Sequence, residues 1–155
     1  MPPIKIDLGC GLTPHPGYVG VDLLGGVGII QHDLRVVPWP FEAATAIEIL
    51  AHDVLEHLPD KNGTMYEIER ILVPGGNVDI LVPDALSPGA FQDPTHVSFW
   101  TRNTFAYYVH DFPDYLALNK RYGYRGNGFR VRSIQTVVSK GPYDLVTHVH
   151  AILTK

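Results

Sequence analysis

The chain has 155 residues, of which 45% are hydrophobic and 18% charged, and its formal net charge is −4 at pH 7. This length predicts a single domain over residues 1–155, with a substantial buried core. The acidic balance argues against binding to nucleic acid, and no apolar run is long enough to cross a membrane. One cysteine excludes an internal disulfide, and the N-terminal sequence has no secretory apolar region, so we expect a cytoplasmic protein.

The N-terminal segment consists of two predicted strands, Ile4–Leu8 and Tyr18–Asp22, joined by a glycine-bearing turn. Gly9 and Gly11 lack a Cβ, so the backbone can turn sharply and lie against a ligand. Open α/β sheets bind their ligands at strand ends. Asp22 ends the second strand and can accept hydrogen bonds from both hydroxyls of a ribose. The segment therefore predicts a site for an adenosine-type cofactor.

Three further apolar runs, Gly28–Gln31, Ala46–Leu50 and Asn77–Val82, predict buried strands of a parallel sheet. A helix is predicted over Lys61–Leu72, ended by Pro74-Gly75-Gly76. A second helix is predicted after Thr101 as its N-cap, through residues 103–109. The segments Phe129–Ser139 and Tyr143–Thr154, separated by a turn at 140–142, predict two antiparallel strands.

The connections after the first two strands are too short for ordinary helices. Nine residues, Gly9 to Gly17, separate these strands, whereas a parallel crossover usually takes about a dozen or more. Pro14 and Pro16 also prevent a regular helix. The five residues that follow Asp22 leave no room for another. We expect an α/β sheet with reduced helices after its first two strands, and a cofactor face that is open or covered by a second subunit.

These segments resemble the class I S-adenosylmethionine-dependent methyltransferases over roughly the first 85 residues. Asp7, Gly9 and Gly11 match the family's strand, acid and G-x-G pattern, and the L-E-H-L-P and P-G-G sequences follow in the family's order. The resemblance implies a Rossmann-like open twisted sheet that uses S-adenosylmethionine. A nicotinamide dinucleotide is disfavoured because His15 and Pro16 occupy the third-glycine region and the acid follows early.

The resemblance also implies which residues form the cofactor site. Asp22 would bind the ribose, Asp33 would meet the adenine amino group, and the backbone near Ala51 and His52 would hold the methionine end. Cys10 is interpreted as a small packing residue of the turn, although a cysteine there could be nucleophilic. The predicted cofactor residues are Asp7, Gly9, Cys10, Gly11, Asp22, Leu23, His32, Asp33, Leu34, Ala51 and His52.

Methyl transfer from a sulfonium mainly requires alignment of donor and acceptor, and a general base helps only if the acceptor must lose a proton. His96 is the predicted acid/base on the acceptor side, with the alternative that it only binds a backbone carbonyl. His52 and Asp53 are predicted to line the pocket beside it. Phe99 and Trp100 are expected to form its wall.

Glu56 and His57 are interpreted as structural residues that pack the turn after the fourth strand. His52, His57 and the intervening acid suggest a metal site, but the helical H-x-x-x-H spacing and a third ligand in register are absent. We therefore expect no metal.

The predicted function is S-adenosylmethionine-dependent methyl transfer to an oxygen or nitrogen of a small-molecule acceptor, by a possible homodimer. The alternative is a non-catalytic binding or interaction module that keeps the fold, since fold does not guarantee function. A basic and aromatic stretch at residues 120–132 could bind single-stranded nucleic acid, but its composition favours an exposed loop.

Overall fold

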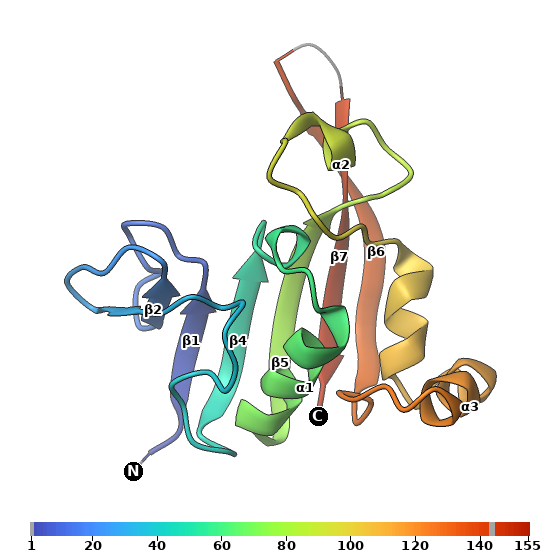
Figure 1. Cartoon of the computed structure of the whole chain (residues 1–155), viewed down its shortest axis with the longest axis horizontal. Coiled ribbons are helices and arrows are strands. Elements are labelled where there is room, and N and C mark those ends of the chain that lie inside the picture. The colour runs from blue at the N-terminus through green and yellow to red at the C-terminus, as the bar shows by residue number, and fades with distance from the viewer. Residues whose placement is uncertain (1, 143–144) are drawn as a thin grey trace.

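A computed structural model describes residues 2–142 and 145–155, in which seven strands form one sheet (Figure 1). The strand order is β3-β2-β1-β4-β5-β7-β6. The first five strands pair in parallel, and β7 runs antiparallel between β5 and β6. The strands are β1 (Ile4–Leu8), β2 (Val19–Asp22), β3 (Ile29–Gln31), β4 (Ala46–His52), β5 (Leu72–Pro83), β6 (Arg130–Lys140) and β7 (Leu145–Thr154).

The predicted α/β sheet, mostly parallel with antiparallel C-terminal strands, is confirmed. The largest boundary difference is at β5, which begins at Leu72 and not at Asn77, because Leu72 already pairs with Ala46 of β4. The P-G-G sequence therefore lies inside the strand, where Gly75 N–H donates to the carbonyl of Lys155 (2.8 Å). Residues 143 and 144, the first two of the last predicted strand, lie outside the described residues.

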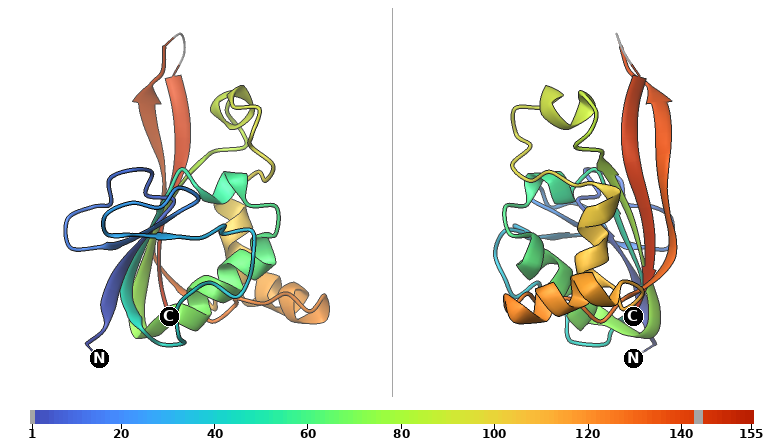
Figure 2. Two further views of the ribbon diagram at one scale, coloured as in Figure 1. Left: turned by 60° about the vertical axis from the view of Figure 1, so that its left-hand side comes forward. Right: turned by 90° about the vertical axis from the view of Figure 1, so that its right-hand side faces the viewer.

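The helical segments of the described chain all lie on one side of the sheet (Figure 2). Helix α1 covers Lys61–Ile71, close to its predicted bounds, and Asp60 caps it by accepting from Gly63 N–H (2.9 Å). Thr101 forms the predicted N-cap, as half of a capping box with Thr104, but it begins a 3₁₀ segment. The other segments are η1 (Leu55–His57), α2 (Gly89–Gln92), η2 (Arg102–Tyr108) and α3 (Pro113–Arg121).

No described helix is both long and apolar enough to cross a membrane.

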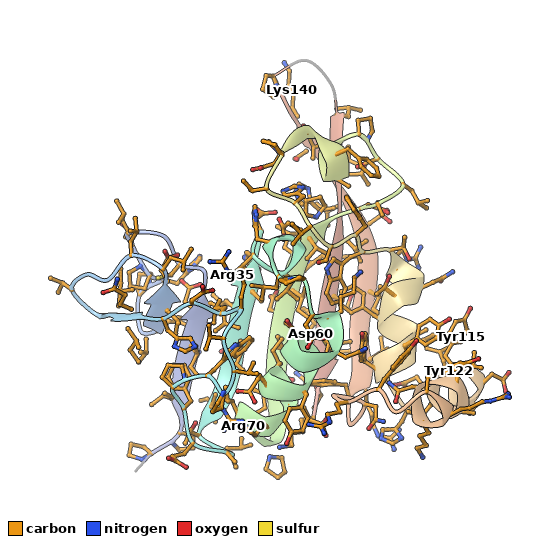
Figure 3. All side chains as sticks on the ribbon, in the orientation of Figure 1. Arg35, Asp60, Arg70, Tyr115, Tyr122 and Lys140 are labelled. Carbon is orange, nitrogen blue, oxygen red and sulfur yellow. The ribbon has the colours of Figure 1, made fainter. Side chains whose placement is uncertain are left out.

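The expected shortage of helices near the first strands is confirmed, and it extends to the connection between β3 and β4. Residues 32–45 contain no helix and instead pack on α1. The Glu67 carboxylate, buried on α1, accepts from the backbone N–H of Trp39 (2.7 Å) and pairs with Arg70 (2.7 Å). Arg70, labelled in Figure 3, also donates to the carbonyl of Phe41 (2.8 Å). One buried carboxylate thus holds this connection against the helix.

Replacing Glu67 with alanine should destabilise the fold by about 3 kcal/mol, because it leaves a buried Trp39 N–H without an acceptor and Arg70 without its partner. Urea unfolding would measure the loss. Glu42→Ala, at an exposed position, is the matched control and should change stability by less than about 0.5 kcal/mol. Equal losses in both variants would show that the buried contact is not what holds the connection.

The sheet face opposite the helices carries polar side chains among apolar ones such as Leu50. Ile49, Ala51, Val78 and Ile80 alternate into the core beneath the helices, so the residues between them point the other way. On that outer face Asp79 accepts from His52 (2.9 Å) and His150 (2.8 Å), and Lys5 pairs with Glu48 (2.7 Å). Water can solvate these charged and polar groups, which lie on the same face as Leu50 and Leu81. That the cofactor face is open or covered by a second subunit stays a prediction.

The Asp79 network should make stability depend on pH. Burial raises the pKa of Asp79, but hydrogen bonds from His52 and His150 outweigh it, so the pKa lies below its usual value. The hydrogen bond to Asp79 raises the pKa of His52, aided by the charges of Asp53 and Asp7. The histidine contribution is therefore complete below the unfolded pKa of about 6.5 and is lost as pH rises through the folded pKa, whereas the Asp79 contribution is lost only in acid.

The free energy of unfolding of the wild type should accordingly be larger at pH 5.5 than at pH 8. This difference between the two pH values should be about 1 kcal/mol larger in the wild type than in Asp79→Asn, after allowance for solvent screening. Urea unfolding at the two pH values would measure this difference. An identical pH dependence in the two proteins would contradict the assignment.

Candidate functional site

A cavity of about 420 Å³ opens where β1, β2, β3 and β4 end. This is the edge at which open α/β sheets bind ligands, and the volume suits a small molecule. Its described lining residues are Gly9, Asp22, Leu23, His32, Asp33, Leu34, Arg35, Asp53, Val54, His57, Leu58 and Thr95.

The turn after β1 contains no helix and is held by two carboxylates. Asp22 accepts from the backbone N–H groups of Gly11 (2.9 Å) and Leu24 (3.1 Å), which joins the turn to the end of β2. Asp7, buried in β1, accepts from the backbone N–H of His15 (2.9 Å) and contacts its ring Nδ1 (2.8 Å). The two side chains fix the start and the end of the turn.

Gly9 satisfies two separate constraints in this turn. Its φ is +64°, in the left-handed region, and a Cβ at this position would lie 2.5 Å from Cγ2 of Val54. Both the backbone conformation and the close approach of Val54 therefore exclude a side chain. The glycine brings β1 against the segment that follows β4, on the cavity wall.

Gly9→Ala should destabilise the protein by about 2 kcal/mol or more, from left-handed strain together with the clash on Val54. Gly123→Ala isolates the strain, since Gly123 has φ +71° and a Cβ added there would meet no atom within 4 Å. Thermal and urea unfolding would compare the two variants. Equal destabilisation would show that the Val54 contact contributes nothing.

Three aspartates, one arginine and two histidines are the charged and titratable residues of the cavity lining. Asp33 pairs with Arg35 through both oxygens, at 2.9 Å from Nε and 2.7 Å from Nη2, and these hydrogen bonds lower the pKa of Asp33 to about 2. Arg35, labelled in Figure 3 at the end of the sheet, is thereby neutralised. With Asp22 and Asp53 also on the wall, the cavity suits a ligand that is cationic and rich in hydrogen-bond donors.

The structure brings together seven of the residues that the sequence predicts for the site. Six of them are predicted for the cofactor and one for catalysis, and they converge from four different strand ends. Their binding roles stay predictions. The seven on the cavity wall are Gly9, Asp22, Leu23, His32, Asp33, Leu34 and Asp53.

His52 lies elsewhere, because it occupies the outward position of β4 and its ring meets Asp79 on the helix-free face. Ala51 is fully buried in the core. Cys10 lies against Gly20, where an added Cβ would be 2.6 Å from its Sγ, and burial raises the pKa of its thiol. Asp7 and Gly11 shape the turn from outside the cavity lining.

A second cavity, of about 310 Å³, adjoins the first and shares Asp53 and His57 with it. Asp53 follows β4 directly with φ +51°, a conformation that aspartate tolerates better than most side chains. His148 of β7 lies 3.2 Å from its carboxylate. The walls also include His96 and residues of α2, so the second cavity lies between the loop after β5 and the C-terminal hairpin.

His96 is largely buried in this second cavity, with Nδ1 2.9 Å from the carbonyl of Ala90 and Nε2 3.9 Å from Glu56 Oε1. His96 therefore contacts a backbone carbonyl through Nδ1, as the alternative prediction has it, and its Nε2 faces Glu56. Glu56 is 2% exposed, and Oε2 has no hydrogen-bond partner among the described residues. Burial raises the pKa of the Glu56 carboxyl to about 7.

Two aromatic residues expected in the pocket wall are placed differently. Trp100 is fully buried and stacks on Phe105 in the core, with its indole N–H donating to the Ser98 hydroxyl (3.0 Å). Phe99 is exposed and stacks on Phe91 of α2. Neither lines either cavity. Alternation along the chain after β5 sends these neighbours in opposite directions.

Sequence reasoning misses several residues of the first cavity. Val54 and Leu58 look like ordinary core positions, and Thr95 comes from a segment remote in sequence. The L-E-H-L pattern suggests a structural role for His57, yet this residue lines both cavities. A signal exists in residues 93–96, where a polar D-P-T-H stretch follows a buried strand.

Known structures share this arrangement of strands. An S-adenosylmethionine-dependent methyltransferase from Mesorhizobium loti has a TM-score of 0.67 at 14% identity, covering 99% of this chain and 91% of that chain. The 1,6-didemethyltoxoflavin-N1-methyltransferase of Burkholderia thailandensis, solved with 1,6-didemethyltoxoflavin and S-adenosylhomocysteine bound, has a TM-score of 0.65 at 16% identity, over 99% and 71% of the two chains. The chain has the class I S-adenosylmethionine-dependent methyltransferase fold.

The same fold occurs in the [4+2]-cyclase SpnF, with a TM-score of 0.62, 13% identity and coverage of 99% of this chain and 75% of that one. No protein-family model matches the chain, and neither does any curated protein. The similarity therefore establishes the Rossmann-like methyltransferase fold, while the chemistry has to be argued from the cavities.

Proposed function

We propose that the protein transfers a methyl group from S-adenosylmethionine to an oxygen or nitrogen of a small-molecule acceptor. The observation that carries this proposal is the composition of the first cavity, which is lined by Asp22, Asp33, Asp53 and Gly9 of the helix-free turn. S-adenosylmethionine carries a sulfonium, an ammonium, a ribose diol and an adenine amino group. Carboxylates attract the two cationic groups, and they accept hydrogen bonds from the ammonium, the ribose hydroxyls and the adenine amino group.

Each carboxylate then has a distinct role. Asp22 already accepts two backbone N–H groups, and the four lone-pair positions of a carboxylate leave it room for the ribose hydroxyls. Asp33, just after β3, would accept from the adenine amino group once Arg35, which is bound to both of its oxygens, releases one of them. His32 and Leu34 lie beside it. The wall formed by Gly9, near Asp53, would take the methionine end.

A nicotinamide dinucleotide fits this cavity less well. Dinucleotide sites place the pyrophosphate at the N-terminus of the helix that follows the first strand. Here residues 9–18 form turns and no helix, so no helix N-terminus is present at that point to bind a pyrophosphate. Asp22 and Asp53 on the cavity wall would repel a pyrophosphate as well. This comparison favours the methyl donor.

The second cavity is the site proposed for the acceptor, because it meets the first at Asp53 and His57. S-adenosylmethionine supplies an already activated methyl group, so the protein mainly has to align the acceptor with it. His96, buried on the acceptor side, and Asp53, at the junction, are the proposed acid/base and orienting groups. His52 is not carried forward in this role, since its ring is bound to Asp79 on the outer face.

The first test is calorimetric titration of the whole chain with S-adenosylmethionine and S-adenosylhomocysteine. We expect micromolar binding that Asp22→Ala weakens more than tenfold, or about 1.4 kcal/mol. Asp114→Ala, in the first turn of α3 and away from both cavities, is the matched control and should bind as wild type does.

Absence of binding to either compound would sink the proposal and leave a non-catalytic module with this fold. Binding without turnover of any oxygen or nitrogen acceptor would favour a non-catalytic cofactor-binding module, or other chemistry such as that of the cyclase with the same fold. The small-molecule acceptor, the cytoplasmic setting and the possible homodimer belong to this proposal.

A further inference from the structure

We propose that Glu56, His57 and His96 bind a divalent transition-metal ion of the zinc type at the wall of the second cavity. One ligand atom from each of these three residues lies within 4.8 Å of the other two. Two imidazoles and one carboxylate form a ligand set that zinc uses in hydrolytic enzymes, with positions left open for another ligand. All three residues line the second cavity, so the open positions would face it.

The hydrogen bonds of His96 fix which of its nitrogens can bind a metal. Its Nδ1 lies 2.9 Å from the carbonyl of Ala90, which can only accept, so Nδ1 carries the proton and donates. In the neutral ring Nε2 then has a free lone pair, and it is this atom that lies 3.9 Å from Glu56 Oε1. A backbone carbonyl that orients a histidine in this way is typical of metal-binding histidines.

His57 is oriented by a similar chain of donors. The Thr95 hydroxyl donates its only proton to Asp93 Oδ1 (2.6 Å). The Nδ1 of His57, which lies 3.0 Å from Thr95 Oγ1 and 3.3 Å from the Thr95 carbonyl, must therefore donate as well. Its Nε2 is left as the nitrogen with a lone pair. Both rings thus offer acceptor nitrogens from fixed orientations.

Glu56 supplies the independent observation that points to a ligand. It is only 2% exposed, and among the described residues no donor reaches its Oε2. Buried polar groups are almost always satisfied, so an orphan carboxylate oxygen beside two acceptor nitrogens calls for a positive charge. Ligands bound to one zinc ion lie roughly 3 to 3.5 Å apart, so the ion would draw the three side chains together by about 1 Å.

The sequence-based expectation of no metal rests on the lack of a third ligand near His52 and His57. In the folded chain His96 supplies that ligand from the loop after β5, and His52 lies on the other face. If the proposed function holds, the ion would replace His96 in its acid/base role, because both nitrogens of that ring would be occupied. It would bind an acceptor oxygen beside the methyl donor, which favours an oxygen acceptor over a nitrogen one. Metal binding itself does not depend on that function.

The test uses metal-free full-length protein titrated with Zn²⁺ by calorimetry and with Co²⁺ by its visible ligand-field bands. We expect one ion per chain, and at least tenfold weaker binding in His96→Gln, His57→Gln and Glu56→Gln. Thr95→Val, which removes an orienting group, should weaken binding about 10- to 100-fold. His150→Gln is the matched control, because it removes a carboxylate-bound histidine from the opposite face and should leave affinity unchanged.

No binding of either ion, or binding that survives all three ligand substitutions, would overturn the proposal. A proton held between Glu56 and a histidine would then be the only positive charge at this cluster. Circular dichroism identifies any of the three ligand variants that fails to fold. The metal affinities of the variants that do fold then decide whether these residues bind the ion. Titration of the metal-free protein with S-adenosylhomocysteine separates the two proposals. If the protein binds S-adenosylhomocysteine but no metal, only the metal site is rejected. If it binds metal but not S-adenosylhomocysteine, only the proposed function is rejected.

Discussion

The structure depends on a turn of ten residues, 9–18, that joins two parallel strands without a helix. Such a connection has few internal hydrogen bonds, so its backbone needs partners from outside. Asp7 and Asp22, at the ends of neighbouring strands, provide them through contacts with His15, Gly11 and Leu24. Asp22 both stabilises the turn and borders the cavity, so the local folding requirement and the candidate binding site share one residue.

In the described chain, helices cover only one side of the sheet, and the two faces differ in their side chains accordingly. The helix-covered face carries the apolar core, whereas the opposite face carries the ion pairs of Lys5 with Glu48 and of Asp79 with two histidines. A parallel sheet is usually covered on both faces. Here ion pairs, set among apolar side chains such as Leu50, occupy the face that a second layer would cover. The buried Glu67 attaches the β3–β4 connection to α1.

Much of this arrangement can be predicted from sequence because it depends on local chemistry. Gly9, Gly11, the prolines that follow and Asp22 lie within one short segment, and their spacing alone indicates a strand, a helix-free turn and a strand-end acid. Helix α1 is equally predictable from its apolar face and the P-G-G sequence that follows it. Strand alternation also decides the position of His52, but only once the register with Asp79 is known.

The second cavity cannot be predicted in this way because its walls come from segments far apart in the chain. His57 and His96 follow two different strands and His148 belongs to the last one, so their proximity is a consequence of sheet order. The lack of a partner for Glu56 is likewise a property of packing, invisible in the L-E-H-L pattern that suggests a structural role. The expectation for Trp100 is wrong for the same reason, since its burial depends on contact with Phe105.

The central claim is that the ligand binds where β1 to β4 end and contacts the helix-free turn. Hydrogen–deuterium exchange of the whole chain with and without S-adenosylhomocysteine tests it most directly. The account predicts slower exchange at residues 9–24, 31–35 and 53–58, and unchanged exchange across β6 and β7. Protection confined to the outer sheet face or to the C-terminal hairpin would contradict it.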